Sequence, residues 1–181
     1  IKYLEGVASS TSKDQHGTIF SEDCKDGFKN DISENTVVID IKHSDNFMDF
    51  IGKAESANVI QESDITKLVV RIKLNNNNPQ ATQLFNIIRE PNVEMGEPES
   101  LGMSIMGTAK KWHTNSGGIT IFDRVVLERI AITDSPSNTD TFINVIKRSI
   151  VNKEEILVSE TKESTEVVVE APAEVVVETV S

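Results

Sequence analysis

Three residues of this chain have the types that acyl transfer from a serine requires, and they lie in three separate segments: His43, Ser104 and Glu128. A serine hydroxyl becomes a nucleophile when a base lies beside it and a substrate can reach it. Histidine is the usual base because its pKa lies near neutrality. A carboxylate can orient that histidine and stabilise its cationic form. The residue types therefore allow a nucleophile, a base and an orienting acid.

His43 follows the apolar segment Val37–Ile41 and precedes the polar segment Ser44–Asn46. A histidine at the end of a buried strand has a fixed backbone and one open side, which suits a general base. The same position is also that of an ordinary surface histidine at a turn. Position alone leaves both interpretations open.

Ser104 lies in the segment Leu101–Gly107, in which Gly102 and Gly107 flank an otherwise apolar strand. Glycine in a strand lets another backbone or a substrate approach closely. Such access is what a serine nucleophile needs. The alternative is a serine that is hydrogen-bonded inside a strand.

Glu128 interrupts the apolar segment Val125–Ile132, although glutamate is a poor strand former. If its side chain faces inward it needs a partner, because burying an unpaired carboxylate is costly. A catalytic histidine would be such a partner. The alternative is a glutamate that faces solvent.

The sequence shows neither the ligand spacing of a metal site nor the glycine-rich loop of a nucleotide site. The other two histidines, His16 and His113, have no metal-ligand spacing on an expected helix. Cys24 is the single cysteine, which excludes an internal disulfide and suits a reducing compartment. No glycine-rich phosphate loop precedes a helix. We therefore expect no metal and no cofactor.

The elements that must position these residues are mostly strands. Alternating or continuous apolar residues predict strands at Lys2–Ala8, Thr36–Lys42, Phe47–Ala54, Lys67–Leu74, Leu101–Lys111 and Gly118–Ile132. Apolar residues at helical spacing behind the N-caps Ser21, Asn78 and Asn138 predict three helices. This combination favours an α+β fold, a mostly antiparallel β-barrel ringed by about three helices.

Length and charge narrow the classes of partner. The chain has 181 residues and a net charge of −11, which argues against a nucleic-acid groove or an anionic membrane patch. No apolar run approaches the ~20 residues that span a bilayer, and no signal-peptide pattern is present. We therefore expect no nucleic acid and no membrane as partner.

The composition changes near residue 152. Residues 152–181 contain eight Glu and two Lys, a net charge of −6, and have neither an aromatic residue nor a glycine. Like-charge repulsion and the lack of large apolar groups oppose burial, whereas the valine triplets favour an edge strand. We expect one domain over residues 1–151 and a disordered acidic tail or linker over residues 152–181, with an edge hairpin as the alternative.

Four segments, in order, resemble motifs of the prohead (capsid maturation) protease family of tailed bacteriophages, which are relatives of herpesvirus assemblin. Leu4–Ser9 followed by Asp14–Gly17 is similar to that family's first strand, which ends in G-x-A-S before a D-x-x-G turn. Ile41–Ser44 with Phe50–Ala54 resembles the family's histidine motif. Leu101–Gly107 resembles its L-S-I-G serine motif. Val126–Thr133 with Ser135–Asn138 resembles its later L-x-E and P-A-N motifs. The resemblance covers about residues 3–150.

The resemblance implies a serine endopeptidase with Ser104 as nucleophile, His43 as general base and Glu128 as the acid that orients His43. The oxyanion donors expected with it are backbone N–H groups of the loop Asp134–Asn138. Its substrates would be the phage scaffold, the major capsid protein and the protease itself, inside a prohead assembled in the host cytoplasm. The implied fold is a closed antiparallel barrel ringed by helices, and whether the chain forms a homodimer stays open.

Two other functions stay compatible with the sequence. A catalytically inactive relative would keep the barrel as a scaffolding or structural module of the capsid, since residue types do not prove geometry. An unrelated β-rich binding domain would use the acidic tail to contact basic partners. Labelling of Ser104 by a serine-directed probe favours an enzyme over the inactive capsid module. Self-processing that depends on His43 or Ser104 favours an enzyme over the unrelated binding domain.

Overall fold

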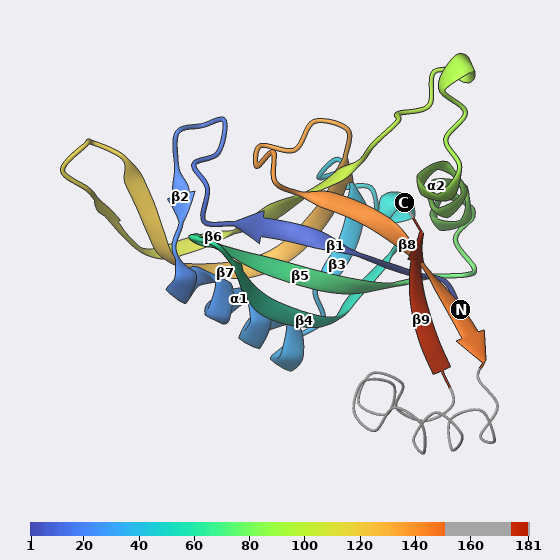
Figure 1. The fold of residues 1–181 in the computed structure, drawn as a ribbon, viewed down its shortest axis with the longest axis horizontal. Coiled ribbons are helices and arrows are strands. Elements are labelled where there is room, and N and C mark those ends of the chain that lie inside the picture. The colour runs from blue at the N-terminus through green and yellow to red at the C-terminus, as the bar shows by residue number, and fades with distance from the viewer. Residues whose placement is uncertain (151–174, 181) are drawn as a thin grey trace.

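The computed structural model describes residues 1–150 and 175–180, in which two α-helices and two short 3-10 helices surround one large sheet (Figure 1). The strands are β1 (Tyr3–Ser10), β2 (Ile19–Phe20), β3 (Val38–Ile41), β4 (Gly52–Glu62), β5 (Ile65–Leu74), β6 (Gly102–Thr114), β7 (Thr120–Thr133), β8 (Phe142–Ile150) and β9 (Val175–Val180). The helices are α1 (Glu22–Glu34) and α2 (Pro79–Arg89), and the 3-10 turns are Phe47–Asp49 and Val93–Met95. None of the helices described is long and apolar enough to cross a membrane.

The sheet is mixed and open rather than the closed antiparallel barrel that the sequence predicted. Its order is β2-β7-β3-β4-β5-β1-β8-β9, with β6 also paired to β7, and β2 and β3 run parallel to β7. Among the described strands, no ladder joins β6 to β8. The two strands approach where Met103 N donates to Thr141 Oγ1 at 3.2 Å, and a Cβ on Gly102 would lie 2.5 Å from the same oxygen. The structure therefore shows a mixed α+β domain, and closure is not shown.

Two of the three predicted helices are present, and their caps are those expected. The Ser21 side chain accepts from Cys24 N at the start of α1, and the apolar face of that helix is buried at Cys24, Phe28 and Ile32. At the start of α2 the Asn78 side chain accepts hydrogen bonds from the backbone N–H groups of Gln80 and Ala81, and Pro79 occupies the first turn.

The third predicted helix is wrong, because the segment after Asn138 forms strand β8. Its apolar residues fit either period, but they are mostly β-branched, and Ile143 and Val145 alternate inward against β1. Asn138 still ends a loop, since its backbone oxygen accepts from Thr141 N at 3.2 Å. Pairing with β1 decides in favour of the strand, and that long-range contact is invisible in the local pattern.

Strand β5 shows most clearly how the sheet forms the core. Leu68, Val70, Ile72 and Leu74 are buried and alternate with half-buried residues, which confirms the predicted alternation. Buried residues of β1, β3, β6 and β7 join them in one core cluster with the apolar face of α1. This core fixes the strands that carry the candidate site.

Part of the acidic C-terminal segment is described. Strand β9 pairs antiparallel with residues 145–150 of β8, which is the edge-strand arrangement that the valine triplets favoured as the alternative to disorder. Residues 151–174 and 181 lie outside the described residues, and so does the prediction made for them.

Candidate active site

His43 is held by a tight turn at the end of β3. Both Lys42 and His43 have positive φ, at 55° and 57°, a conformation that residues with a side chain rarely adopt. The turn is stabilised from within, since His43 N donates to Asp40 Oδ1 at 2.8 Å and Ser44 N donates to Ile41 O at 3.1 Å. Backbone strain of this kind persists only where the surroundings enforce it, and it is found most often at functional sites.

Ser104 is brought to this turn by the order of the strands. On β7, Ala131 is the pairing partner of Ser104 on β6 and also of Asp40 on β3. Strands β3 and β6 therefore flank β7 at the same level, so the residue three positions beyond Asp40 can reach Ser104. The small Ala131 side chain leaves room between them.

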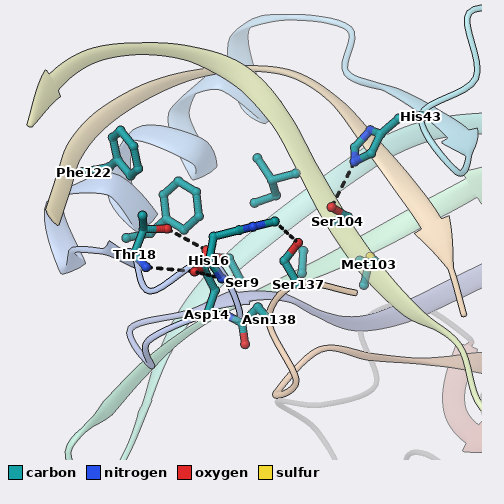
Figure 2. A pocket seen from close by; sticks show the side chains of 13 residues that line it. Ser9, Asp14, His16, Thr18, His43, Met103, Ser104, Phe122, Ser137 and Asn138 are labelled. Atoms are coloured by element: carbon teal, nitrogen blue, oxygen red, sulfur yellow. Dashed lines mark hydrogen bonds between the residues drawn. The ribbon is translucent and has the colours of Figure 1, made fainter. Parts of the chain in front are cut away.

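The His43 and Ser104 side chains are in hydrogen-bond contact although they are 61 residues apart in sequence. His43 Nε2 lies 2.9 Å from Ser104 Oγ, and the two side chains point toward one another in Figure 2. This distance is within the range of a hydrogen bond and is the arrangement a base needs to take the serine proton. The structure thus places together two of the three residues chosen from the sequence.

Glu128 is not part of this contact. Its side chain is exposed, and its Oε1 accepts from Thr108 Oγ1 at 2.5 Å. The β6–β7 register pairs Arg129 with Met106 and Leu127 with Gly107, so Glu128 falls in the irregularity between them. An extra residue in a strand changes the direction of the side chains. The structure corresponds to the solvent-facing alternative for Glu128, not to an acid that orients His43.

An acid that was not singled out from the sequence lies beside His43 instead. Asp40 is fully buried, and Arg129 Nη1 is 3.5 Å from its Oδ2. Burial raises the pKa of the Asp40 carboxyl, while the hydrogen bond from His43 N and the positive charges of His43 and Arg129 act in the opposite direction. The available signal was an acid inside the apolar run Val37–Ile41, three residues before the histidine.

The pair opens into a cavity of about 480 Å³, shown in Figure 2. One part of its wall is apolar and includes Ile105 and the stacked rings of Phe20 and Phe122, whose centroids are 5.5 Å apart. Another part is polar, where His16 Nε2 lies 3.1 Å from Ser137 Oγ. A cavity with mixed walls beside a nucleophile can hold a substrate side chain next to the bond that reacts.

The remaining histidine and the cysteine lie apart from this chemistry. His113 Nδ1 is 2.6 Å from Asp123 Oδ2, and the histidine is exposed on the β6–β7 hairpin. Cys24 is buried, and burial raises the pKa of its thiol, so it is a poor nucleophile. Within the described residues, no group of three or more His, Cys, Asp or Glu could hold a metal ion.

A comparison with known families matches the chain to the family described as "Caudovirus prohead serine protease" over residues 5–156, a range that contains β2 to β8, most of β1 and the whole candidate site. No curated protein matches the chain.

Proposed function

The chain belongs to the caudovirus prohead serine protease family, and we propose that it is a serine endopeptidase in which Ser104 is the nucleophile and His43 the general base. The observation that carries this proposal is the 2.9 Å contact between His43 Nε2 and Ser104 Oγ at the edge of an open cavity. Membership of the family supplies the class of reaction, and the contact supplies the residues.

The mechanism follows from which atoms face each other. His43 Nε2 takes the proton of Ser104 Oγ as that oxygen attacks the carbonyl carbon of a peptide bond. The tetrahedral intermediate collapses to an acyl-enzyme when the His43 imidazolium gives its proton to the leaving amine. Water then attacks the acyl carbon while His43 takes its proton; the bond to Ser104 Oγ breaks, this oxygen regains the proton from His43, and the acid product leaves and ionises to a carboxylate.

The developing oxyanion needs donors on the side of the carbonyl opposite to the histidine. We assign this part to backbone N–H groups of the loop 134–138. Support comes from Ser137 and Asn138, which line the same cavity as Ser104. The loop is held in place because Gln15 N donates to Ser137 O at 2.9 Å and because the Asn138 side chain hydrogen-bonds to Ser10.

The biological setting that we propose is head maturation inside a phage prohead assembled in the host cytoplasm. The substrates are segments of the scaffold and the major capsid protein, together with the protease chain itself. The family match supports the setting. A protease enclosed with its substrates works at high effective concentration, so weak binding in the cavity suffices to occupy it.

The test compares purified wild-type chain with Ser104→Ala, His43→Ala and the control Ser56→Ala, which changes an exposed serine on β4. We expect a fluorophosphonate probe to add one label to the wild type and to Ser56→Ala but none to Ser104→Ala. Intact mass of the full-length chain, and of a scaffold protein mixed with it, should show cleavage products in the same two samples. Cleavage at the wild-type rate by Ser104→Ala would refute the assignment. A folded wild type that neither labels nor cleaves would favour a structural capsid module instead.

A further inference from the structure

Two buried polar atoms beside the candidate nucleophile have no hydrogen-bond partner among the described residues: His43 Nδ1 and Asp40 Oδ2. Buried polar atoms are nearly always paired, and leaving two unpaired in adjacent side chains is costly. One is a ring nitrogen that can donate, and the other is a carboxylate oxygen that can accept. From this complementarity we infer that Asp40 is the positioning residue that orients His43. The inference rests on the proposed function of His43 as general base.

The backbone already holds the two groups against each other. Asp40 Oδ1 accepts from His43 N at 2.8 Å, which fixes the carboxyl group next to the histidine that follows it by three residues. The second oxygen of the same carboxyl is the unpaired one. Catalytic hydrogen bonds are often long without substrate and shorten when substrate binds. A hydrogen bond from Nδ1 to Oδ2 would satisfy both unpaired atoms at once.

Arg129 does not compete for this oxygen. Its Nη1 lies 3.5 Å from Asp40 Oδ2, which is long for a hydrogen bond. The same Nη1 donates to Ser44 O at 2.8 Å, and Nη2 donates to Asp45 Oδ1 at 2.8 Å. The guanidinium therefore supplies positive charge that favours the ionised form of Asp40 but leaves Oδ2 available to His43.

The hydrogen bond that we infer has a direct consequence for the reaction. If Nδ1 carries the proton and donates it to Asp40 Oδ2, then Nε2 has a free lone pair directed at Ser104 Oγ, as a base requires. When Nε2 takes the serine proton, the imidazolium lies next to the Asp40 carboxylate. Asp40 thus fixes the tautomer before the step and stabilises the charge after it.

Other ionisable groups near the pair also contribute to its titration. Arg129 reaches Asp40 from β7, and Asp45 lies on the turn beyond His43. Across the cavity are His16 and Asp14. Lys42 points to Asp134, at 3.2 Å, on the neighbouring loop. These groups are unchanged in the variants below, apart from a matched change of Asp45, so differences between variants report on Asp40.

The variant Asp40→Asn separates the two functions of the carboxyl group. Its amide oxygen can still accept from His43 N and keep the turn. Its amide nitrogen is a donor, so it favours the opposite tautomer of His43, in which Nε2 carries the proton and cannot take one from Ser104. We expect kcat to fall by about 10²–10⁴-fold with the melting temperature nearly unchanged.

Two matched controls change a carboxylate without touching the proposed pair. Asp45→Asn removes the exposed partner of Arg129, and Glu128→Gln removes the exposed acid on β7. Both should keep kcat within a few-fold of wild type. A loss in Glu128→Gln equal to that in Asp40→Asn would overturn the inference.

A measurement that needs no protease activity separates this inference from the proposed function. Imidazole ¹⁵N and ¹³C NMR of full-length Ser104→Ala, with and without Asp40→Asn, reports the tautomer of His43. We expect the Nδ1–H tautomer with Asp40 present and the Nε2–H tautomer in the double variant. The same tautomer in both proteins would overturn the assignment of Asp40 even if the protease is active. A changed tautomer in a chain that cleaves nothing would support Asp40 as the partner of His43 while the proposed function fails.

Discussion

Lys25 on α1 provides a quantitative test of how the wall of the cavity is stabilised. Its side chain is fully buried, and its Nζ donates to Phe20 O at 2.9 Å and lies 5.4 Å from the centre of the Phe20 ring. Burial lowers the pKa of Lys25 from 10.5 to about 8. Phe20 also lines the cavity beside Ser104, so the hydrogen bond from Lys25 holds the backbone of a residue in the cavity wall.

The lowered pKa makes the stability of the domain depend on pH in a definite direction. Between pH 8 and 10.5 the unfolded chain holds a proton on Lys25 that the folded chain has lost. Stability rises with pH wherever the unfolded state binds more protons, so the folded domain gains free energy across this window. A pKa difference of this size corresponds to about 3 kcal/mol. Below pH 8 the full cost of burying the charged amine is present.

The assay is urea unfolding of wild type and Lys25→Met at intervals from pH 6 to 10.5. Methionine fills similar space without a charge, so it removes both the cost of the buried amine and its hydrogen bond to Phe20 O. The hydrogen bond shifts the difference between the two proteins by a nearly constant amount, whereas the titration changes it with pH. We expect the stability of Lys25→Met relative to wild type to be constant up to about pH 7 and then to fall by about 3 kcal/mol toward pH 10.5. A difference that stays flat over the whole range would refute a depressed pKa, and Lys29→Met, exposed on the same helix, should show such a flat difference.

Two further changes test the packing around the site. Asp31 receives two hydrogen bonds from Arg124, at 2.6 and 2.9 Å, which join α1 to β7. Burial raises the pKa of its carboxyl, but the hydrogen bonds from Arg124 and Leu127 N, together with the charge of Arg124, outweigh burial and lower the pKa. Asp31→Ala should cost about 1–3 kcal/mol in urea unfolding, because it leaves the Leu127 N–H without its acceptor and removes the partner of Arg124. The exposed Asp26→Ala should cost less than about 0.5 kcal/mol, and an equally small cost for Asp31→Ala would contradict this role of Asp31. In β1, a Cβ on Gly6 would lie 1.9 Å from Phe142 O, so Gly6→Ala should separate β1 from β8 and lower the melting temperature by several degrees, measured by circular dichroism; an unchanged melting temperature would show that this pairing is not needed for stability.

Local patterns predicted many elements of the fold, but not the way in which they assemble. The predicted strand Phe47–Ala54 was wrong over its first half, where a 3-10 turn forms at Phe47–Asp49 before β4 begins at Gly52. The alternation in β5 and the caps Ser21 and Asn78 identified their elements because the signal lies within a few residues. The segment after Asn138 was misassigned because its apolar residues fit two periods and only the pairing with β1 decides between them. Closure of the sheet is likewise a property of contacts between strands that no local pattern encodes.

The contact between His43 and Ser104 could be expected only through the family resemblance. Neither residue has a local feature that indicates the other, since 61 residues separate them, with β4, β5 and α2 in between. What joins them is Ala131, which pairs with β3 on one side and with β6 on the other. At Ala131, β7 pairs with β3 in the parallel direction and with β6 in the antiparallel direction. An alternation of apolar and polar residues within one strand does not specify which strands lie on either side of it.

The position of the acid shows how one residue of register changes a functional assignment. Side chains two positions apart on a strand share a face, so Arg129 lies on the same face as Ala131, next to Asp40 and the His43 turn. Glu128, one position earlier, falls in the irregularity of the β6–β7 register, and its exposed carboxylate accepts from Thr108 instead of reaching the turn. The motif match led to the strand β7, which lies beside Asp40, but the residue of β7 that reaches Asp40 is the cation Arg129 and not the expected acid. A positive charge at that position makes sense only if a carboxylate comes from elsewhere, and β3 supplies Asp40 at the level of Ala131. Under the inference made above, Asp40 on β3, with Arg129 of β7 beside it at 3.5 Å, takes the role that the motif match assigned to a glutamate on β7.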